Sequence, residues 1–84
     1  VIAMCLSGVD AIAAVRALAG PTNGRPAAPG TIRGSYCMSF QENIVHASDS
    51  PETAEVELKR FFRPGEILEW DQCYFQYLYA NDEF

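Results

Sequence analysis

The chain opens with an apolar run, and the pattern changes abruptly after it. Residues 1–6 are all apolar, β-branched side chains come first, and Ser7-Gly8 closes the run. Such a run is typical of a buried strand, and the break makes it too short for the competing helix. From residue 9 or 10 to about 19, apolar residues recur at helical spacing until Gly20-Pro21 interrupts them. We therefore expect a strand over 1–6 and a helix over about 10–19.

The middle of the chain loses this regularity. Residues 21–34 contain three prolines and three glycines, a density that favours a long loop over any regular element. Loops of this length are usually functional. The next six residues, 35–40, alternate so that Tyr36, Met38 and Phe40 would share one face. This alternation predicts a second strand.

A second helix is predicted to start at residue 51. Ser50 is a suitable N-cap, Pro51 suits the first helical position, and Asp49 is an alternative cap. Pro64-Gly65 would end this helix. Its apolar stripe comprises Ala54, Leu58, Phe61 and Phe62. Glu57 borders the stripe, where a carboxylate either finds a partner or lies at a solvated edge.

The last part of the chain is rich in aromatic residues. They are Trp70, Tyr74, Phe75, Tyr77, Tyr79 and Phe84. These side chains are too many to leave in water, so we expect them to pack on a missing N-terminal part of the domain or on a neighbouring subunit. The sequence also begins inside an apolar run without a methionine, which favours a missing N-terminal part.

Size and composition limit the protein to one small domain. Eighty-four residues give a marginal core, and 49% hydrophobic with 20% charged residues is typical of a globular chain. Three widely spaced cysteines without a C-x-x-C motif argue against disulfides or zinc and favour the cytoplasm. Asp10 and Arg16 would each cost about 2.5–3.5 kcal/mol near the centre of a bilayer, so no membrane span is predicted.

The charges are unevenly distributed along this acidic chain, whose net charge is −5. No acid lies between Asp10 and Glu42, whereas Arg16, Arg25 and Arg33 all do. A locally positive segment in an acidic protein fits a small anionic ligand better than DNA, which needs an extended basic face. We therefore predict no nucleic-acid partner.

The single histidine, His46, lies between the arginine-containing loop and the start of the second helix. A lone histidine is often structural, but imidazole changes charge near neutral pH and can act as a nucleophile. A metal shared with Cys37 would have only two protein ligands, and a Cys–His hydrolase has no oxyanion motif in its favour. These residues alone leave the structural and the catalytic interpretation open.

The order and spacing of the motifs are more specific than any one of them. Ala28-Pro-Gly-Thr-Ile-Arg-Gly, then Asn43-Ile-Val-His-Ala-Ser-Asp-Ser, then Ala54-Glu-Val-Glu resembles the nucleoside diphosphate kinase family. The resemblance covers residues 1 to about 62 and implies that family's fold, an α+β ferredoxin-like sandwich with a four-stranded antiparallel sheet. It implies that residues 1–84 are the C-terminal part of one such domain, starting at its third strand, with a core over 1–62 and a tail over 63–84.

The resemblance also implies an activity. The family moves the γ-phosphate of a nucleoside triphosphate to a nucleoside diphosphate by a ping-pong mechanism through a phosphorylated histidine, which His46 matches. Glu57 matches the glutamate that orients this ring, and Ser48 matches a serine that supports the arrangement. The alternative is a non-catalytic nucleotide-binding or oligomerisation module of the same family.

Ligands and partners follow from the same resemblance. Arg16, Thr22 and Arg33 match positions that contact the phosphates, and Asn43 matches one at the sugar–phosphate end. Mg²⁺ would be held through the nucleotide phosphates, so no protein metal ligands are expected. A homo-oligomer, tetramer or hexamer, is implied, and so is a first half of the domain without which this chain would be an incomplete enzyme.

Two positions depart from the family pattern. Ala47 stands where the family usually has glycine, and Gly24 replaces the proline common after Thr22-Asn23. A methyl group at position 47 is tolerable if the local φ is negative and costly if it is positive. Glycine at position 24 should loosen the turn.

Overall fold

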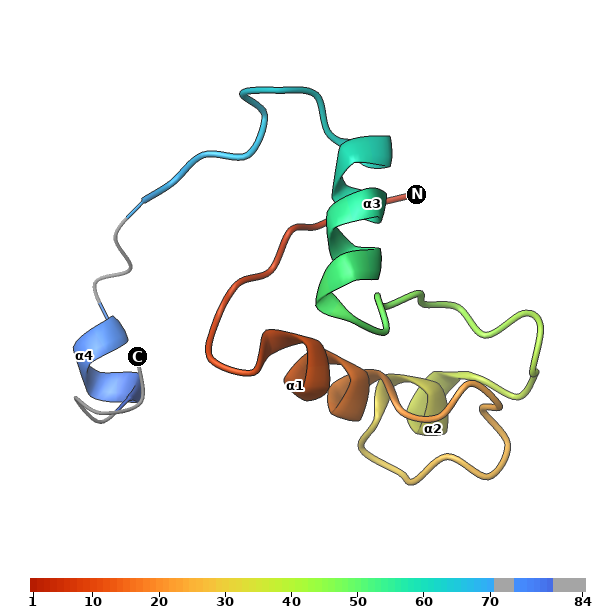
Figure 1. Ribbon diagram of the computed structural model, residues 1–84. Coiled ribbons are helices and arrows are strands. Elements are labelled where there is room, and N and C mark those ends of the chain that lie inside the picture. Colours follow the sequence, from red (N-terminus) through yellow and green to blue (C-terminus); the bar gives the residue numbers. More distant parts are fainter. Residues whose placement is uncertain (71–73, 80–84) are drawn as a thin grey trace.

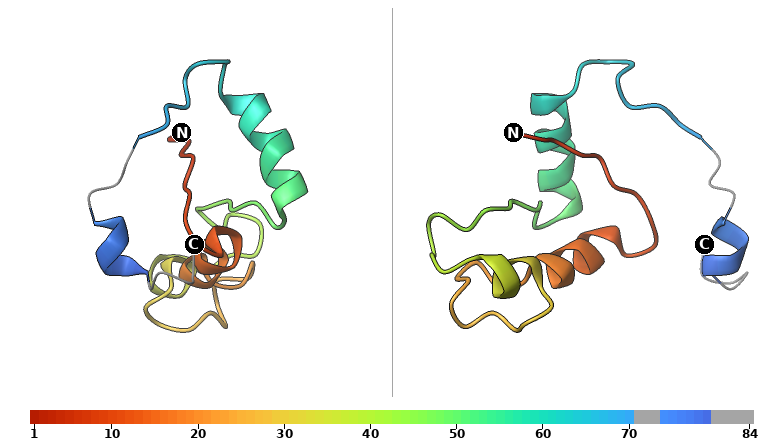
Figure 2. Two further views of the ribbon diagram at one scale, coloured as in Figure 1. Left: turned by 60° about the vertical axis from the view of Figure 1, so that its left-hand side comes forward. Right: turned by 180° about the vertical axis from the view of Figure 1, so that it is seen from behind.

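Helices make up the regular structure of the residues that the structure describes. The computed structural model describes residues 1–70 and 74–79, and within these ranges the chain forms four helices (Figure 1). They are α1 (Ala11–Ala19), α2 (Ile32–Tyr36), α3 (Pro51–Phe61) and α4 (Phe75–Leu78). Helices α1 and α2 are in contact, and the segment that leaves α2 turns back toward α1 before α3 begins (Figure 2). None of the helices in the described ranges has the length and hydrophobicity that a bilayer crossing needs.

Helix α1 confirms the first predicted helix to within a residue. It follows Asp10, whose φ is 53° and whose side chain makes no capping hydrogen bond. It ends at Ala19, and at the next residue, Gly20, φ is 88° and the amide donates to the Arg16 carbonyl oxygen at 3.0 Å. A positive φ at this position suits glycine, which has no Cβ to clash with the preceding turn.

Helix α3 confirms the second predicted helix. The Ser50 hydroxyl accepts a hydrogen bond from the Thr53 amide at 3.1 Å, and Pro51 occupies the first turn, where a missing N–H is harmless. Ser50, and not the alternative Asp49, is therefore the cap. The helix ends at Phe61, shortly before Pro64-Gly65.

Helix α2 corrects both the predicted loop over 21–34 and the predicted strand over 35–40. The Thr31 hydroxyl accepts from the Gly34 amide at 2.9 Å and donates to the Ala28 carbonyl at 2.7 Å, which starts a short helix inside the expected loop. The helix runs on through Tyr36, and residues 37–40 follow without regular structure. A local cap prevails over a six-residue alternation because a strand needs a partner and a turn of helix does not.

The predicted strand over residues 1–6 is also wrong for the described part of the chain. These six residues are exposed and irregular, and Figure 2 shows them leaving α1 as a separate coil. A strand completes its hydrogen bonds only on a neighbouring strand, and the described residues contain none. The expected antiparallel sheet is therefore not formed within them.

The buried residues are few and lie around α1, α2 and the loop between them. Ala19, Ala27, Cys37 and the charged side chain of Arg33 are each less than a tenth exposed. The radius of gyration is 14.8 Å, whereas a compact domain of this length would have about 12 Å. The small core therefore serves mainly to fix the loop between α1 and α2 against the segment that follows α2.

Candidate functional site

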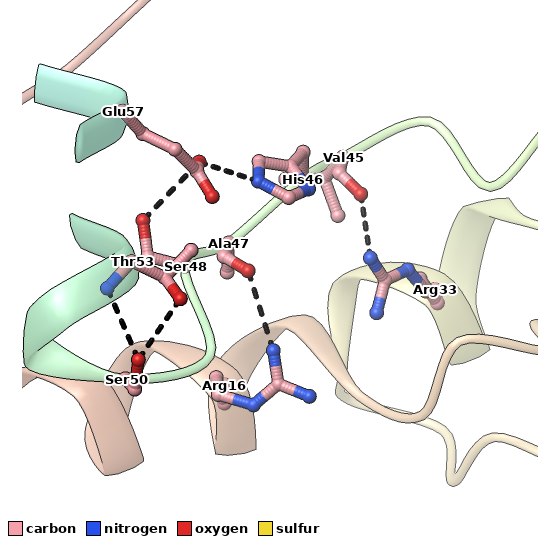
Figure 3. Close-up of polar contacts among 9 residues, drawn as sticks. All are labelled: Arg16, Arg33, Val45, His46, Ala47, Ser48, Ser50, Thr53 and Glu57. Carbon is pink, nitrogen blue, oxygen red and sulfur yellow. Dashed lines mark hydrogen bonds and ion pairs between the residues drawn. The ribbon is translucent and has the colours of Figure 1, made fainter.

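The candidate site is built around the ring of His46, in the coil between α2 and α3. Its Nε2 lies 2.6 Å from Oε2 of Glu57, which projects from α3 (Figure 3). The histidine side chain is 73% exposed and the glutamate only 16%, so the carboxylate is held while the ring faces solvent. Because a carboxylate accepts, the proton of a neutral ring belongs on Nε2. Nδ1, on the ring edge away from Glu57, then carries the lone pair.

A second hydrogen bond fixes the same carboxylate. The Ser48 hydroxyl donates to Oε2 of Glu57 at 3.3 Å. Helix α3 starts between these two residues, so the Ser50 cap that sets the helix start also sets where the carboxylate stands. Glu57 therefore has partners and is not a solvated edge residue.

Arg16 brings α1 to the histidine segment. Its Nη1 donates to the carbonyl oxygen of Ala47 at 3.2 Å, and the side chain is exposed (Figure 3). A guanidinium has five N–H groups, so most of the donors of Arg16 remain available beyond this bond. An exposed cation next to the nucleophile candidate suits an anionic ligand.

Arg33 is placed differently. It is 7% exposed, and its three guanidinium nitrogens donate to the backbone oxygens of Gly20 at 2.8 Å, Asn43 at 3.2 Å and Val45 at 2.5 Å. These bonds join the end of α1 to the segment that leads to His46. Buried polar groups satisfied in this way stabilise a fixed arrangement.

Thr22 and Asn43 are in direct contact. The Asn43 side-chain amide donates to the Thr22 carbonyl oxygen at 3.3 Å, so the turn after α1 lies against the start of the histidine segment. Two segments twenty-one residues apart in sequence thus form one wall of the site.

A pocket of about 250 Å³ collects these side chains. It is lined by Arg16, Thr22, Arg33, Asn43, Val45, His46, Ala47, Asp49, Thr53 and Glu57. Six of the seven residues predicted for the site line it, and Ser48 contacts it through Glu57. Thr53 and Asp49 also line it, although the sequence motifs indicate no site role for either residue. Thr53 could have been found from its spacing, since it precedes Glu57 by one helical turn.

The alanine next to the histidine is accommodated without strain. In the described ranges the non-glycine residues with positive φ are Asp10 and Ile44, so Ala47 is not among them. The methyl group at position 47, where the family pattern has glycine, therefore meets no conformational penalty. No cluster of three or more His, Cys, Asp or Glu side chains that could bind a metal occurs in the described residues.

Comparison with known sequences and structures identifies the family. The profile described as nucleoside diphosphate kinase matches residues 1–67. The chain belongs to the nucleoside diphosphate kinase family. Among its curated relatives, the nucleoside diphosphate kinase of Parabacteroides distasonis is 69% identical over 84 residues, which is all of this chain and 55% of that protein. The Staphylothermus marinus relative is 54% identical over 70 residues, covering 83% of this chain and 50% of that protein.

Solved nucleoside diphosphate kinases have the same arrangement over the matched part. The Halobacterium salinarum enzyme in complex with CDP superposes with a TM-score of 0.81 at 39% identity, covering 87% of this chain and 49% of that one. A family protein from Babesia bovis gives a TM-score of 0.81 at 38% identity, covering 86% of this chain and 49% of that one. The chain thus spans about half the length of the family members it matches.

Proposed function

We propose that this chain carries the phosphoryl-accepting site of a nucleoside diphosphate kinase. The activity would move the γ-phosphate of a nucleoside triphosphate to a nucleoside diphosphate through phosphorylated His46. The observation that carries the proposal is the contact between Nε2 of His46 and Oε2 of Glu57 at 2.6 Å, on an exposed ring beside a pocket with arginines. A binding-only module would not require this pair.

The proposed reaction has two half-reactions at one nitrogen. In the first, the lone pair of Nδ1 of His46 attacks the γ-phosphorus. The bond from that phosphorus to the β–γ bridging oxygen breaks, and the nucleoside diphosphate leaves with the electron pair. In the second, a terminal phosphate oxygen of another nucleoside diphosphate attacks the phosphorus on His46, the bond from Nδ1 to that phosphorus breaks, and the electron pair returns to the ring nitrogen. One site thus serves two anionic substrates in turn, which gives ping-pong kinetics.

The neighbouring groups would act by positioning and by charge. Glu57 keeps the proton of the neutral ring on Nε2 and stabilises the positive charge that the ring gains on attack, and Ser48 holds the carboxylate still. Arg16 is the exposed cation that can reach incoming phosphates. The phosphate contacts predicted for Thr22, Arg33 and Asn43 are included in the proposal because all three residues line the pocket.

A magnesium ion would arrive with the nucleotide and neutralise part of its phosphate charge. The pocket fits such an ion only in part, because its acidic side chains are Asp49 and Glu57, and Glu57 already accepts bonds from His46 and Ser48. Magnesium commonly keeps several waters and binds few protein carboxylates beside substrate phosphates. The nucleotide would thus supply most of its ligands.

The remaining features of the proposal concern the surroundings of the site. In a complete ferredoxin-like sandwich, residues 1–6 would pair with strands from the first half of the domain. We include three such features in the proposal: the first half of the domain, a tetrameric or hexameric assembly, and a cytoplasmic location. The resemblance supports all three features, and the unpaired apolar segment at residues 1–6 supports the first half of the domain alone.

Labelling with γ-³²P-ATP tests the proposal directly. Two samples are compared: the chain by itself, and a chimera in which it replaces the matching segment of the Parabacteroides distasonis relative. Label on histidine survives base and is lost in acid, and because the chain has one histidine, label mapped by peptide analysis to this segment must lie on His46. We expect labelling of the chimera, and transfer of the label to an added nucleoside diphosphate.

Two variants sharpen the labelling test. His46→Gln keeps an amide that can donate to Glu57 but cannot be phosphorylated, and His46→Ala removes both properties. Both should lose the label while nucleotide binding, measured by calorimetry, persists. Unchanged turnover in either variant, or a folded chimera that binds nucleotide and never labels, would favour the non-catalytic binding module.

A further inference from the structure

The aromatic tail returns to the segment that precedes α1. The hydroxyl oxygen of Tyr79, one residue beyond α4, accepts a hydrogen bond from the Val9 amide at 3.2 Å. The two residues are seventy positions apart in the sequence. Figure 1 shows α4 on the side of the molecule where α1 begins. The family profile ends at residue 67, so one partner of this contact lies outside the segment that the profile matches.

Gly8 leaves room for this contact. A Cβ added there would lie 3.0 Å from the Tyr79 hydroxyl oxygen, which is short for a carbon–oxygen contact. Val9 and Tyr79 are half-buried, whereas Tyr77 in α4 is 78% exposed. A hydrogen bond that is partly shielded from solvent is stronger than one in water. Gly8 and Val9 thus form a socket for one hydroxyl group, which we call the tyrosine socket.

The start of α1 has little local support of its own. Asp10 has a φ of 53° and its side chain makes no capping hydrogen bond, so the first turn lacks the usual N-cap contact. The other end of α1 lies against the start of α2, where a Cβ added at Gly20 would lie 2.7 Å from the Thr31 hydroxyl oxygen. Tyr79 therefore supplies a second fixed point for the helix, at the end that lacks one.

We propose that Tyr79 is a positioning residue: its hydroxyl, bound in the tyrosine socket, fixes the start of α1 and through that helix places Arg16 at the phosphate pocket. Arg16 lies between the two ends of α1, and its exposed guanidinium donates to the Ala47 oxygen. Gly8 and Arg16 border the same hollow of about 630 Å³, between the starts of α1 and α3. A shift at the start of α1 thus turns Arg16 relative to α3. The catalytic part of this proposal rests on the proposed kinase activity.

The variant Tyr79→Phe removes the hydroxyl and keeps the ring, so it tests the hydrogen bond alone. In the Parabacteroides distasonis chimera we expect kcat/KM to fall by about threefold to tenfold, the range that the loss of one hydrogen bond allows. Tyr77→Phe is the matched control, because it makes the same change at an exposed position of α4, and it should leave kcat/KM unchanged. An unchanged kcat/KM in Tyr79→Phe would overturn the positioning role.

A double-mutant cycle with Arg16 separates positioning from a general loss of stability. Arg16→Ala removes the group that Tyr79 is proposed to place, so Tyr79→Phe in that background should change kcat/KM by less than about twofold. The four proteins are compared at a temperature where circular dichroism shows each of them folded. Losses that multiply in the double variant would mean that Tyr79 acts by a route that does not include Arg16, and would refute the positioning role.

Exchange of the Val9 amide with deuterium, followed by NMR of the ¹⁵N-labelled chimera, tests the tyrosine socket independently of catalysis. Tyr79→Phe should speed this exchange by about fivefold or more, and Tyr77→Phe should not. Gly8→Ala should also speed it, because the added Cβ displaces the hydroxyl, and should add nothing in the Tyr79→Phe background. Unchanged exchange in Tyr79→Phe would refute the contact.

These measurements also separate the inference from the proposed function. If the parent chimera binds nucleotide but is never labelled by γ-³²P-ATP, the kinase proposal fails. The exchange of the Val9 amide still decides whether Tyr79 occupies the tyrosine socket. The nucleotide affinities of the same four proteins of the Arg16 cycle then decide whether that contact places Arg16.

Discussion

At the scale of single residues, close backbone approach explains a departure from the family pattern. A Cβ added at Gly24 would lie 2.5 Å from Sγ of Cys37 and 2.6 Å from the Cys37 carbonyl oxygen. The Gly24 amide also donates to the Ser39 oxygen at 3.3 Å, a bond that proline could not make. The flexibility of glycine predicts a looser turn at this position. The close packing and the hydrogen bond instead hold the turn in place. Glycine lets the loop after α1 pack against the buried cysteine.

Gly24→Ala should accordingly destabilise the folded chain. The clash involves backbone atoms, which cannot rotate away, so we expect a loss of about 1–3 kcal/mol in the free energy of unfolding, as for overpacked cores. Urea unfolding of the chimera measures it. In a background with Cys5→Ser and Cys73→Ser, the Cys37 thiol should also become reactive toward Ellman's reagent.

Gly30→Ala provides the comparison for this prediction. Gly30 has a φ of 97° but open space around its missing Cβ, so alanine there costs conformational energy without displacing the cysteine. Both variants should lose stability, and only the change at Gly24 should expose Cys37. An unreactive thiol in Gly24→Ala would mean that the loop adapts without moving the cysteine.

At the scale of elements, helix α3 links stability to catalysis through its cap. The Ser50 hydroxyl accepts a hydrogen bond from the Thr53 amide, and the start of the helix in turn sets the position of Glu57. Ser50→Ala should lower the free energy of unfolding by about 0.5–2 kcal/mol, because an amide at the helix start loses its partner. The labelling rate of His46 should fall as well, since the first turn that orients Glu57 frays. Ser50→Asp keeps a capping oxygen and should preserve both, measured by urea unfolding and by labelling.

The helices that the sequence predicted correctly are those defined by local signals. Ser50-Pro51 sets the start of α3, and Gly20-Pro21 sets the end of α1. Both signals depend only on residues within one helical turn of the boundary. Helix α2 was not predicted, because the surrounding prolines and glycines favour a loop. Thr31, three residues before Gly34, is a suitable N-cap residue and was the one local signal for this helix. Predicting the strands failed for a different reason, since pairing depends on distant segments that a local pattern does not contain.

The candidate site shows the same limit. Family motifs indicated His46, Glu57 and Ser48, and the fold brings the three side chains together. The buried arrangement of Arg33 was not predictable, because its partners lie ten to thirteen residues away on two segments whose approach no local pattern encodes. Strain at Ile44 was equally invisible, since isoleucine does not ordinarily signal a positive φ.

At the scale of the whole molecule, large apolar side chains remain open to solvent. Ile2, Met4 and Leu6 are 87%, 70% and 57% exposed, and Tyr36, Met38 and Trp70 are at least 74% exposed. Exposed groups on this scale mark surfaces that another part of a protein covers. Trp70, Tyr74 and Tyr77, from the aromatic tail, fit the same pattern, whereas the side chain of Phe75 and all of Phe84 lie outside the described residues.

The state of residues 1–6 provides the last prediction. By itself the chain offers this segment no partner strand among its described residues, so the amides there should exchange with deuterium within seconds. In the chimera, where the first half of a related domain is present, pairing should protect them by about a hundredfold or more. Mass spectrometry of peptides covering residues 1–6 measures the difference. The amide of Thr53, bonded to Ser50 in the chain itself, should show a much smaller change and serves as the internal control. Protection of residues 1–6 in the isolated chain would mean that they pair without the first half, and rapid exchange in a folded chimera would mean that they are not a strand of its sheet.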